Sequence, residues 1–419
     1  MIPRYQITEV STIWEERSKF NYFLEVEKAL LKALEEEKII PQVSENFSKV
    51  TINLKRIHEI ENVTHHDVIA FCSSITEQVS ADVGKYFHFG CTSSDIIDTS
   101  LSLQLRDSLR IELRDLETFI SALKNKAIET KSILTLGRSH GMYAEPMSFG
   151  FKFLSYLAEA KRVHKDLSDY EKNLTGKISG AVGNYTILST RTEEKTLSLL
   201  GLKVEELSTQ IIPRDHLVSL AQIQARLADL MERLCIEIRH LHRSDVGEVV
   251  EGFKVGQKGS STMPHKKNPI SAENISGLSR ILRSHENIAH ENTLLWHERD
   301  ISHSSNERMW LPDSFGIACY ILRRGVRMIN ELYINKEVIE DRTFKEFRSL
   351  SSFLLHQLLP AYSGSREDLY SIIQAASFEC KDLSSMCEFI QAKTQLSVSV
   401  PNLRDLYQEK IELVYQRFI

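Results

Sequence analysis

Long stretches of this chain contain no proline, and this constrains the fold more than any other feature. Proline is absent between residues 41 and 146 and again between 146 and 213. Because proline removes a backbone donor and clashes with the preceding helical turn, such stretches permit very long helices. Apolar residues recur every three or four positions over 109–127 and 220–241, which predicts helices of about five turns. We expect residues 149–174 and 270–288 to be helical as well.

Alternation with a period of two, the pattern of a half-buried strand, is not evident in the 419 residues, so we predict an all-α fold. A chain of this length has room for two or three domains, and its middle third should be a bundle of long helices. The apolar stripes could be plain intramolecular core. Helices this long nevertheless expose more apolar surface than one chain covers, which favours self-association.

Composition excludes several classes of protein. The formal net charge is −5 with no basic block, so nothing indicates nucleic-acid binding. No apolar run approaches the ~20 residues that span a bilayer, and the N-terminus lacks the apolar core of a signal peptide. The six cysteines form no CxxC pair and the 15 histidines show no metal-ligand spacing. We therefore expect reduced thiols in a cytoplasmic protein without a metal site.

Residues 259–269 read Gly-Ser-Ser-Thr-Met-Pro-His-Lys-Lys-Asn-Pro. Glycine frees the backbone and proline restricts it, so this segment should be a shaped loop and not a helix. Its residues suit an anion-handling site with a hydroxyl at the reacting end. The alternative is an ordinary polar surface loop.

The same run closely resembles the GSSxMPxKxNP loop of the fumarase/aspartase superfamily. The resemblance implies that Ser260 removes a proton from a carbon next to a carboxylate, with Ser261 beside it as a substrate contact. It also implies that Lys266 and Asn268 hold that carboxylate. Glu273 matches a glutamate that supports the catalytic histidines, although at a helix start it could equally be a cap and dipole residue.

The superfamily resemblance also implies an architecture. It predicts an N-terminal helical domain over 1–92, a central helical bundle over 93–345 and a C-terminal helical domain over 346–419. In this superfamily, five long helices from each subunit form a twenty-helix core in a homotetramer, and each active site borrows segments from three subunits.

Residues 88–95 read His-Phe-Gly-Cys-Thr-Ser-Ser-Asp and precede a predicted helix. Thr, Ser and Asp are common N-cap residues, so the segment could simply be a helix cap. A helix N-terminus also offers free N–H groups and a partial positive charge, which suit a carboxylate. The segment resembles the superfamily's HxGxTSxD motif, which implies that Thr92 and Ser93 bind the substrate and makes His88 a further candidate.

Residues 137–146 place His140 in a glycine-flanked turn. Such a histidine could be an ordinary surface residue, but histidine is also the side chain best suited to donate a proton near neutral pH. The segment resembles the GRTHGQxAEP motif of the adenylosuccinate lyase family, which implies that His140 is the general acid. Ser139, Met142 and Tyr143 depart from the commoner Thr, Gln and His of that motif.

Two N-terminal segments resemble the same family. The start of the chain matches its MIxRY motif, which implies that Arg4 and Tyr5 contact the nucleotide phosphate. The ENVTHHDVIAF segment matches ExxTRHDVxAF, with His66 and Asp67 in register and His65 in place of the usual arginine. The resemblance implies that His66 orients the substrate or stabilises its phosphate.

The WHERDISHSSNERMWLP segment separates this family most clearly from its superfamily. It supplies Arg299, Ser304 and Arg308, which match phosphate and ribose ligands, and arginine suits phosphate through its fork of N–H donors. The alternative is a salt-bridged surface helix. The TQxxxRD match implies Gln210 as a ligand, ahead of Arg214.

The resemblance as a whole implies β-elimination of fumarate from adenylosuccinate, giving AMP, and from succinylaminoimidazole carboxamide ribotide in purine biosynthesis. The leaving group and the carboxylate carry the chemistry, so no cofactor is expected. The alternatives are another superfamily lyase, a carboxymuconate-type cycloisomerase, or a non-catalytic structural protein on the same scaffold.

Overall fold

The computed structural model describes residues 2–252, 256 and 262–419, and most of them are helical. Two compact units make up the fold, and each contains three stretches of the chain. The first unit comprises Met1–Thr118, Arg162–Glu232 and Ile275–Arg324. Helices accordingly dominate, as the sequence predicts, while the division into three domains and the tetramer remain predictions.

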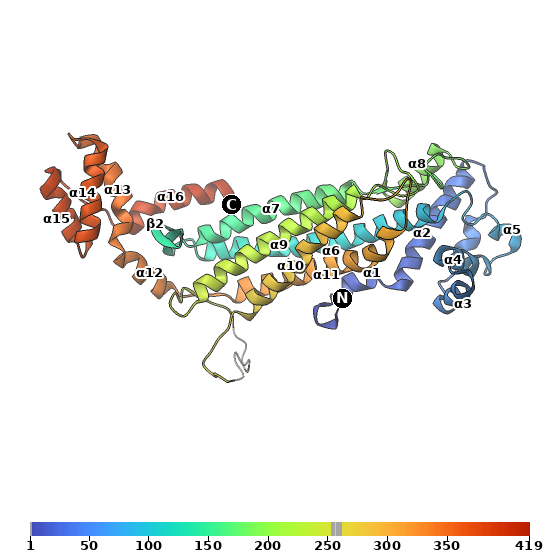
Figure 1. The fold of residues 1–419 in the computed structure, drawn as a ribbon, viewed down its shortest axis with the longest axis horizontal. Helices are drawn as coiled ribbons and strands as arrows, with labels where there is room; N and C mark the ends of the chain where they lie inside the picture. Colours follow the sequence, from blue (N-terminus) through green and yellow to red (C-terminus); the bar gives the residue numbers. More distant parts are fainter. Residues whose placement is uncertain (1, 253–255, 257–261) are drawn as a thin grey trace. The chain divides into compact units, whose positions relative to one another are not determined.

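The long helices supply residues to both units (Figure 1). They are α6 (Ser93–Glu129), α7 (Gly150–Lys172), α9 (Asp215–His242), α10 (Ile270–Glu291) and α11 (Ser302–Glu331). The 37 residues of α6 correspond to about 55 Å at ~1.5 Å per residue. Helices α7 and α10 confirm the helical stretches predicted over 149–174 and 270–288.

The first unit also holds the N-terminal elements and a pair of two-residue strands. These elements are η1 (Pro3–Tyr5), α1 (Thr8–Ile13), α2 (Glu16–Glu36), η2 (Ser44–Phe47), α3 (Leu54–Thr64), α4 (Asp67–Thr76), α5 (Ala81–Gly84), α8 (Thr190–Leu200), β3 (Thr175–Gly176) and β4 (Lys203–Val204). Phe20, Phe23 and Phe71 join α2 to α4, with ring centroids 5.6–5.8 Å apart. This aromatic core fixes the start of α4, where predicted substrate residues lie.

Polar contacts link the long helices within the first unit. Gln224 of α9 donates to Glu112 of α6 at 2.9 Å, and both side chains are buried. Arg283 of α10 binds Asp229 of α9 at 2.7 Å. Leu220, Leu227 and Leu230 are fully buried, so the apolar stripe predicted on α9 does form core.

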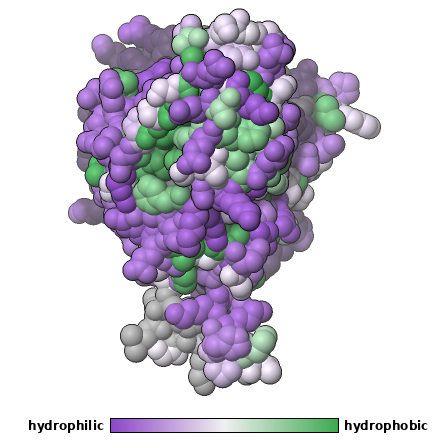
Figure 2. Space-filling model, turned by 90° about the vertical axis from the view of Figure 1, so that its left-hand side faces the viewer, coloured by the Kyte–Doolittle hydropathy of each residue, from purple (hydrophilic) through white to green (hydrophobic). Residues whose placement is uncertain are grey.

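The second unit comprises Phe119–Lys161, Arg233–Asn274 and Gly325–Ile419. Its further elements are β1 (Leu134–Ser139), β2 (Met142–Ser148), β5 (Val249–Val250), β6 (Tyr333–Ile334), α12 (Lys336–Lys345), η3 (Phe347–Leu350), α13 (Ser351–Leu358), η4 (Leu359–Ala361), α14 (Arg366–Glu379), α15 (Leu383–Thr394) and α16 (Leu403–Phe418). Helices α13, α14 and α15 share a core of buried leucine, isoleucine and methionine side chains. The face drawn in Figure 2 is mostly hydrophilic around a patch of hydrophobic residues.

Three two-stranded sheets interrupt the helical fold in the described part of the chain, and none of them was predicted from the sequence. The largest is the antiparallel hairpin of β1 and β2, in which Leu134 pairs with Ser148 and Ser139 pairs with Met142. The first three residues of β1 are all buried, so no period of two is visible there. Among the described residues, no helix is both long enough and apolar enough to cross a membrane.

Candidate active site

Three residues predicted to bind substrate line one cavity of the first unit. The cavity has a volume of about 330 Å³, and Asp67, Ser304 and Arg308 line it together with Lys19. Asp67 binds the Lys19 ammonium at 2.7 Å and lies 3.7 Å from the Arg308 guanidinium. Burial alone would raise the pKa of Asp67, but these two cations outweigh it and lower the pKa below its ordinary value. The cavity is therefore lined by charges of both signs.

His66 reaches from the start of α4 to the start of α6. His66 is the N-cap residue of α4, and its Nδ1 accepts the backbone N–H of Ile69 at 3.4 Å. Its Nε2 lies 3.3 Å from Oγ of Ser93. An Nδ1 that accepts leaves the proton of a neutral ring on Nε2, so His66 is set to donate toward Ser93. Two residues predicted separately from the sequence are thus in contact.

Asp95 organises the segment around Thr92 and Ser93. Helix α6 begins at Ser93, and Oδ2 of Asp95 accepts the N–H of Thr92 at 2.8 Å, which corresponds to one half of a capping box. Oδ1 accepts the N–H groups of Ser179 and Gly180, and the ammonium of Lys177 also binds Asp95. Since this carboxylate and Lys177 are fully buried, the pair fixes the N-terminus of α6.

Gln210 and Arg299 form a second contact between predicted residues. Nη1 of Arg299 lies 3.3 Å from Oε1 of Gln210. Asp300 shapes the turn that carries Arg299 by accepting N–H groups of Trp296 at 2.7 Å and Ser302 at 2.9 Å. The hydrogen bonds from Ser302 and Trp296 lower the pKa of Asp300 to about 2. The turn therefore keeps its anionic anchor throughout the neutral pH range.

Arg214, the second candidate in the Gln210 segment, has a structural role. Its guanidinium lies between Asp98 at 2.7 Å and Glu307 at 2.9 Å, and all three side chains are buried. Burial raises the pKa of Glu307 to about 7 even though Arg214 opposes this. With both carboxylates on its donors, Arg214 is occupied within the protein.

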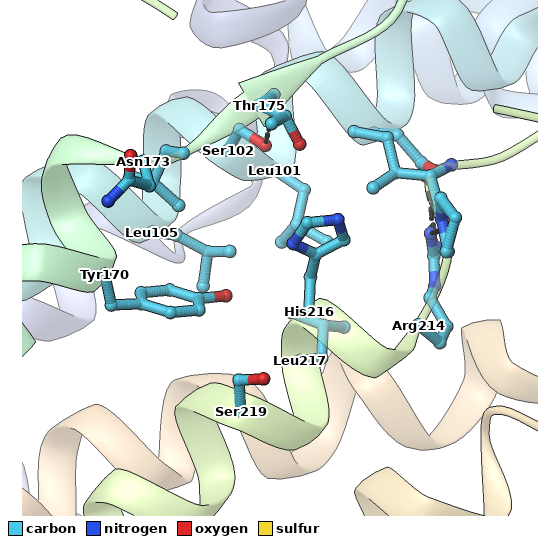
Figure 3. Close-up of a pocket in the computed structure, with 14 residues that line it drawn as sticks. Leu101, Ser102, Leu105, Tyr170, Asn173, Thr175, Arg214, His216, Leu217 and Ser219 are labelled. Carbon is cyan, nitrogen blue, oxygen red and sulfur yellow. Dashed lines mark hydrogen bonds and ion pairs between the residues drawn. The ribbon is translucent and has the colours of Figure 1, made fainter. Parts of the chain in front are cut away.

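A second cavity of about 160 Å³ borders this buried arginine (Figure 3). Several of its polar side chains already have partners. Ser102 donates to the carbonyl of Thr175 at 2.6 Å, and Nε2 of His216 binds Glu205 at 3.0 Å. Apart from Arg214, whose donors are occupied by Asp98 and Glu307, none of the predicted substrate residues lines this cavity, so we do not assign the substrate to it.

His140 occupies the tip of the hairpin in the second unit. His140 and Gly141 form the two-residue connection between β1 and β2, with φ values of 53° and 78°. Two successive positive φ angles define a type I′ turn, which suits the twist of a hairpin and favours glycine at the second position. The turn expected from the flanking glycines is confirmed, and the side chain of His140 is exposed.

Arg138 anchors this hairpin from near the end of β1, close to the turn. It forms a bidentate ion pair with the buried carboxylate of Glu248, which also accepts from Arg342 at 2.7 Å. The guanidinium of Arg138 lies 5.2 Å from the ring centroid of Tyr143. The turn that carries His140 is therefore held at its base by a fork-shaped ion pair.

The signature segment is described only from Thr262 onward, so Ser260 and Ser261 lie outside the described residues. Lys266 is exposed and its backbone N–H donates to the carbonyl of Met263 at 3.1 Å. Asn268 is half-buried immediately before α10. Glu251 accepts the first N–H groups of α10, those of Ser271 and Ala272, at 2.9 and 2.8 Å. Glu251, and not Glu273, thus caps this helix.

Four other predicted residues lie in the first unit. Arg4 is exposed, and the ring of Tyr5 packs edge-on against Tyr320 at 5.1 Å. His65 ends α3 in the left-handed conformation with φ 52°, which the usual arginine would adopt less readily. His88 contacts the buried carboxylate of Glu27.

The sequence analysis missed Lys19 and Glu27. Both lie on α2, whose amphipathic pattern is that of an ordinary core-facing helix. Their partners Asp67 and His88 are 48 and 61 positions further along the chain, so local patterns contain no signal for these contacts.

Comparison with known proteins identifies the family. The family described as Lyase matches residues 5–282. The chain is 41% identical to an adenylosuccinate lyase of Helicobacter pylori over 381 residues, which are 89% of this chain and 86% of the relative. It is 35% identical to that of Bacillus subtilis over 428 residues, covering 100% of this chain and 99% of the relative.

Solved structures share the fold. A β-carboxy-cis,cis-muconate cycloisomerase from Acinetobacter calcoaceticus matches with a TM-score of 0.82 and 20% identity over 98% of each chain. A fumarate lyase from Mesorhizobium matches with a TM-score of 0.81 and 21% identity over 94% of this chain and 91% of the other. Identity this low supports the fold alone, whereas the higher and nearly full-length identities above support a family. The chain belongs to the adenylosuccinate lyase family.

Proposed function

We propose that this protein eliminates fumarate from adenylosuccinate, giving AMP, and from succinylaminoimidazole carboxamide ribotide. The observation that carries this proposal is identity of 35% to 41% with adenylosuccinate lyases over nearly the whole chain. The fold alone does not identify the activity, because a cycloisomerase and a fumarate lyase share the same fold. No specific observation favours those activities or a purely structural role.

The difficult step is removal of a weakly acidic proton from the carbon beside a carboxylate. Negative charge then builds up on that carboxylate, so donors must stand where the charge develops. The first turn of α6, with Thr92 and Ser93, offers N–H groups and the positive end of a helix dipole. Lys266 and Asn268 of the signature segment would add a cation and an amide.

A serine and a histidine would carry out the two proton transfers. We assign Ser260 as the base, since it occupies the reacting position of the signature. A serine needs nearby donors and a cation to favour its alkoxide, and Lys266 suits that purpose. His140 would protonate the leaving nitrogen from the tip of its hairpin, with Glu273 as its supporting carboxylate. His66 would orient the substrate.

The nucleotide would bind chiefly through the first unit. The cavity lined by Asp67, Ser304 and Arg308 offers a guanidinium and a hydroxyl to a phosphate and ribose. The remaining ligands that we propose are Arg4, Tyr5, His65, His88, Gln210, Ser261 and Arg299.

We further propose a homotetramer with shared active sites in the cytoplasm. Exposed apolar side chains on the long helices support self-association, and examples are Ile128 of α6, Ile236 of α9 and Ile281 of α10, each 42–48% exposed. The six cysteines are all unpaired, which agrees with a reducing compartment. Activity that persists in a folded, isolated monomer would contradict the shared site.

The direct test is an absorbance assay that follows adenylosuccinate loss together with fumarate release. We expect the wild-type protein to release AMP and fumarate in equal amounts. Ser260→Ala should abolish turnover and leave adenylosuccinate binding, measured by calorimetry, nearly unchanged, because the variant loses the base and not a charged ligand. Failure of the wild-type protein to release fumarate would exclude this function, and normal turnover by Ser260→Ala would remove Ser260 from the role of base.

A further inference from the structure

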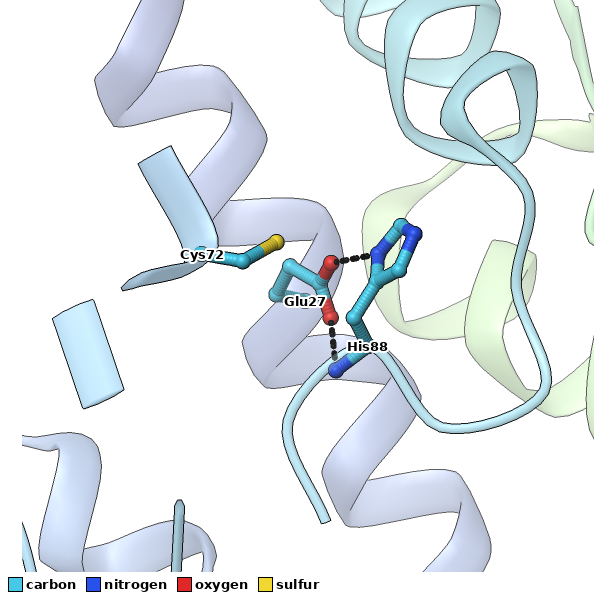
Figure 4. Close-up of side chains that lie close together, drawn as sticks. All are labelled: Glu27, Cys72 and His88. Carbon is cyan, nitrogen blue, oxygen red and sulfur yellow. Dashed lines mark hydrogen bonds and ion pairs between the residues drawn. The ribbon is translucent and has the colours of Figure 1, made fainter. Parts of the chain in front are cut away.

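A fully buried carboxylate holds His88 at two points. Oε1 of Glu27, on α2, lies 2.6 Å from Nδ1 of His88, and Oε2 accepts the backbone N–H of the same residue at 3.1 Å (Figure 4). The side chain of Glu27 has no exposed surface, whereas that of His88 is 24% exposed. Cys72 of α4 completes a group whose ligand-type atoms lie within 4.8 Å of one another.

The geometry of this group indicates a shared proton and not a metal ion. Two ligands bound to one zinc ion at about 2.0 Å, with a tetrahedral angle between them, are separated by about 3.3 Å. The oxygen of Glu27 and the nitrogen of His88 are much closer than that. Their separation is instead typical of a charge-assisted hydrogen bond, in which Nδ1–H donates to the carboxylate.

The two contacts to Glu27 fix both the backbone and the ring of His88. The residue adopts the left-handed conformation with φ 60°, which few residues other than glycine favour. Gly90 follows with φ 73° in a turn where an added Cβ would lie 2.8 Å from Leu188. In Figure 4 the second ring nitrogen, Nε2, points away from Glu27 and Cys72. Within the described part of the chain, no hydrogen-bond partner of Nε2 is found.

The charges around His88 favour the imidazolium. Burial lowers the pKa of His88, but the carboxylates of Glu27 and Asp95 outweigh this, so the pKa is raised. The other titratable groups of this cluster are the thiols of Cys72 and Cys91, whose pKa values burial raises, and Lys177, which is paired with Asp95. A carboxylate as deeply buried as Glu27 also requires a cationic partner, and His88 is the one in contact.

We propose that Glu27 is a positioning residue that holds His88 as an imidazolium with Nε2–H turned toward an anionic group of the substrate at the N-terminus of α6. Only three residues lie between His88 and Thr92, which immediately precedes that helix. The inference deepens the proposed function and rests on it, because the substrate of that reaction carries the anionic groups.

The kinetic test compares Glu27→Gln with the wild-type protein at pH 6 and pH 8. The amide oxygen still accepts Nδ1–H, but the side chain carries no charge, so His88 should lose its proton at lower pH. The NH2 group of the amide cannot accept the backbone N–H of His88, which Oε2 of Glu27 accepts in the wild type. We expect the KM for adenylosuccinate to rise about tenfold at pH 8, which corresponds to a loss of one charged hydrogen bond. The rise should be smaller at pH 6, and kcat should change little at either pH.

Matched variants separate positioning from general stability. His88→Gln should raise KM at both pH values, and adding Glu27→Gln to it should have little further effect, because the two residues act as one unit. Cys72→Ala removes the uncharged neighbour and should leave the pH dependence of KM unchanged. Additive effects of the two substitutions, or a pH-independent fall of kcat and thermal stability together, would overturn the proposal.

A chemical readout keeps this test independent of turnover. Diethylpyrocarbonate modifies neutral imidazole, so the extent of His88 modification, measured by mass spectrometry against pH, reports its protonation. The midpoint should move to lower pH in Glu27→Gln, even if the protein fails to cleave adenylosuccinate and the proposed function is wrong. An unchanged midpoint in a folded variant would overturn the role of Glu27.

Discussion

The two histidines assigned to the reaction occupy contrasting sites. His66 caps α4 in the first unit, and hydrogen bonds engage both of its ring nitrogens. His140 stands at the exposed tip of a hairpin in the second unit, and no hydrogen bond to its ring is found among the residues described. Each side chain is nevertheless attached to a firmly anchored backbone, one by an N-cap and the other by the ion pair of Arg138 with Glu248.

The contrast between the two histidines indicates that the two units have different roles in the proposed reaction. In the first unit, the predicted ligands already contact one another, as His66 does Ser93 and Arg299 does Gln210. Such contacts reduce the ordering that substrate binding requires. The second unit holds His140, the proposed proton donor, on a turn with its side chain exposed. We infer that the first unit mainly binds and orients the nucleotide, while the second mainly contributes reacting groups.

The largest expected effect is that of His140→Asn. Asparagine adopts positive φ readily, and Asn-Gly is a preferred type I′ turn, so the hairpin should remain intact while the acid is removed. We expect kcat to fall about 10²- to 10⁴-fold, the usual contribution of a general acid, with little change in KM or melting temperature. The rate of fumarate release gives kcat and KM, and calorimetry gives the melting temperature. A variant that keeps its wild-type kcat would show that His140 is not the acid.

A smaller effect should follow the matched change in the first unit, His66→Asn. Asparagine is among the best N-cap residues, so α4 should keep its cap and the protein its stability. The variant loses the Nε2 donor, and kcat/KM should fall about 10- to 100-fold, as expected for one lost hydrogen bond to a charged substrate group. If His66→Asn reduced turnover as strongly as His140→Asn, the division between binding and chemistry would be wrong.

The smallest effect on turnover should come from Glu112→Gln, which tests the bundle interior of the first unit. Burial raises the pKa of Glu112 to about 7, whereas the carboxyl titrates near ~4.3 in an unfolded chain. The folded state thus binds the proton more tightly, and stability declines as pH rises from ~4.3 to about 7.

Glutamine at position 112 can pair with Gln224, whose buried Oε1 has no hydrogen-bond partner among the described residues. We therefore expect the variant to lose less thermal stability than the wild type between pH 5 and pH 8, with unchanged kcat. Glu117→Gln, at an exposed position of the same helix, is the control. Equal pH slopes for the wild type and Glu112→Gln in calorimetry would contradict the raised pKa.

The helices could be predicted because their evidence is periodic and local. Stripes such as Leu220, Leu227 and Leu230 need only the 3.6-residue repeat and the absence of proline. The hairpin escaped prediction since β1 buries consecutive residues, which depends on what packs around it. Asp67, Ser304 and Arg308 were predicted because they stand in short local motifs. Lys19 and Glu27 were not predicted, because their contacts are with residues far along the chain.

The turn at His140 and Gly141 links side-chain chemistry to the handedness of the backbone. Of the residues that exchange a proton near neutral pH, histidine is the one that also tolerates a left-handed conformation with little strain. Replacement of His140, the proposed acid, by lysine, tyrosine or glutamate would therefore strain the backbone of the turn as well as alter the acidity of the side chain. Any redesign of the proton donor must first move it to another residue or rebuild the connection between the two strands.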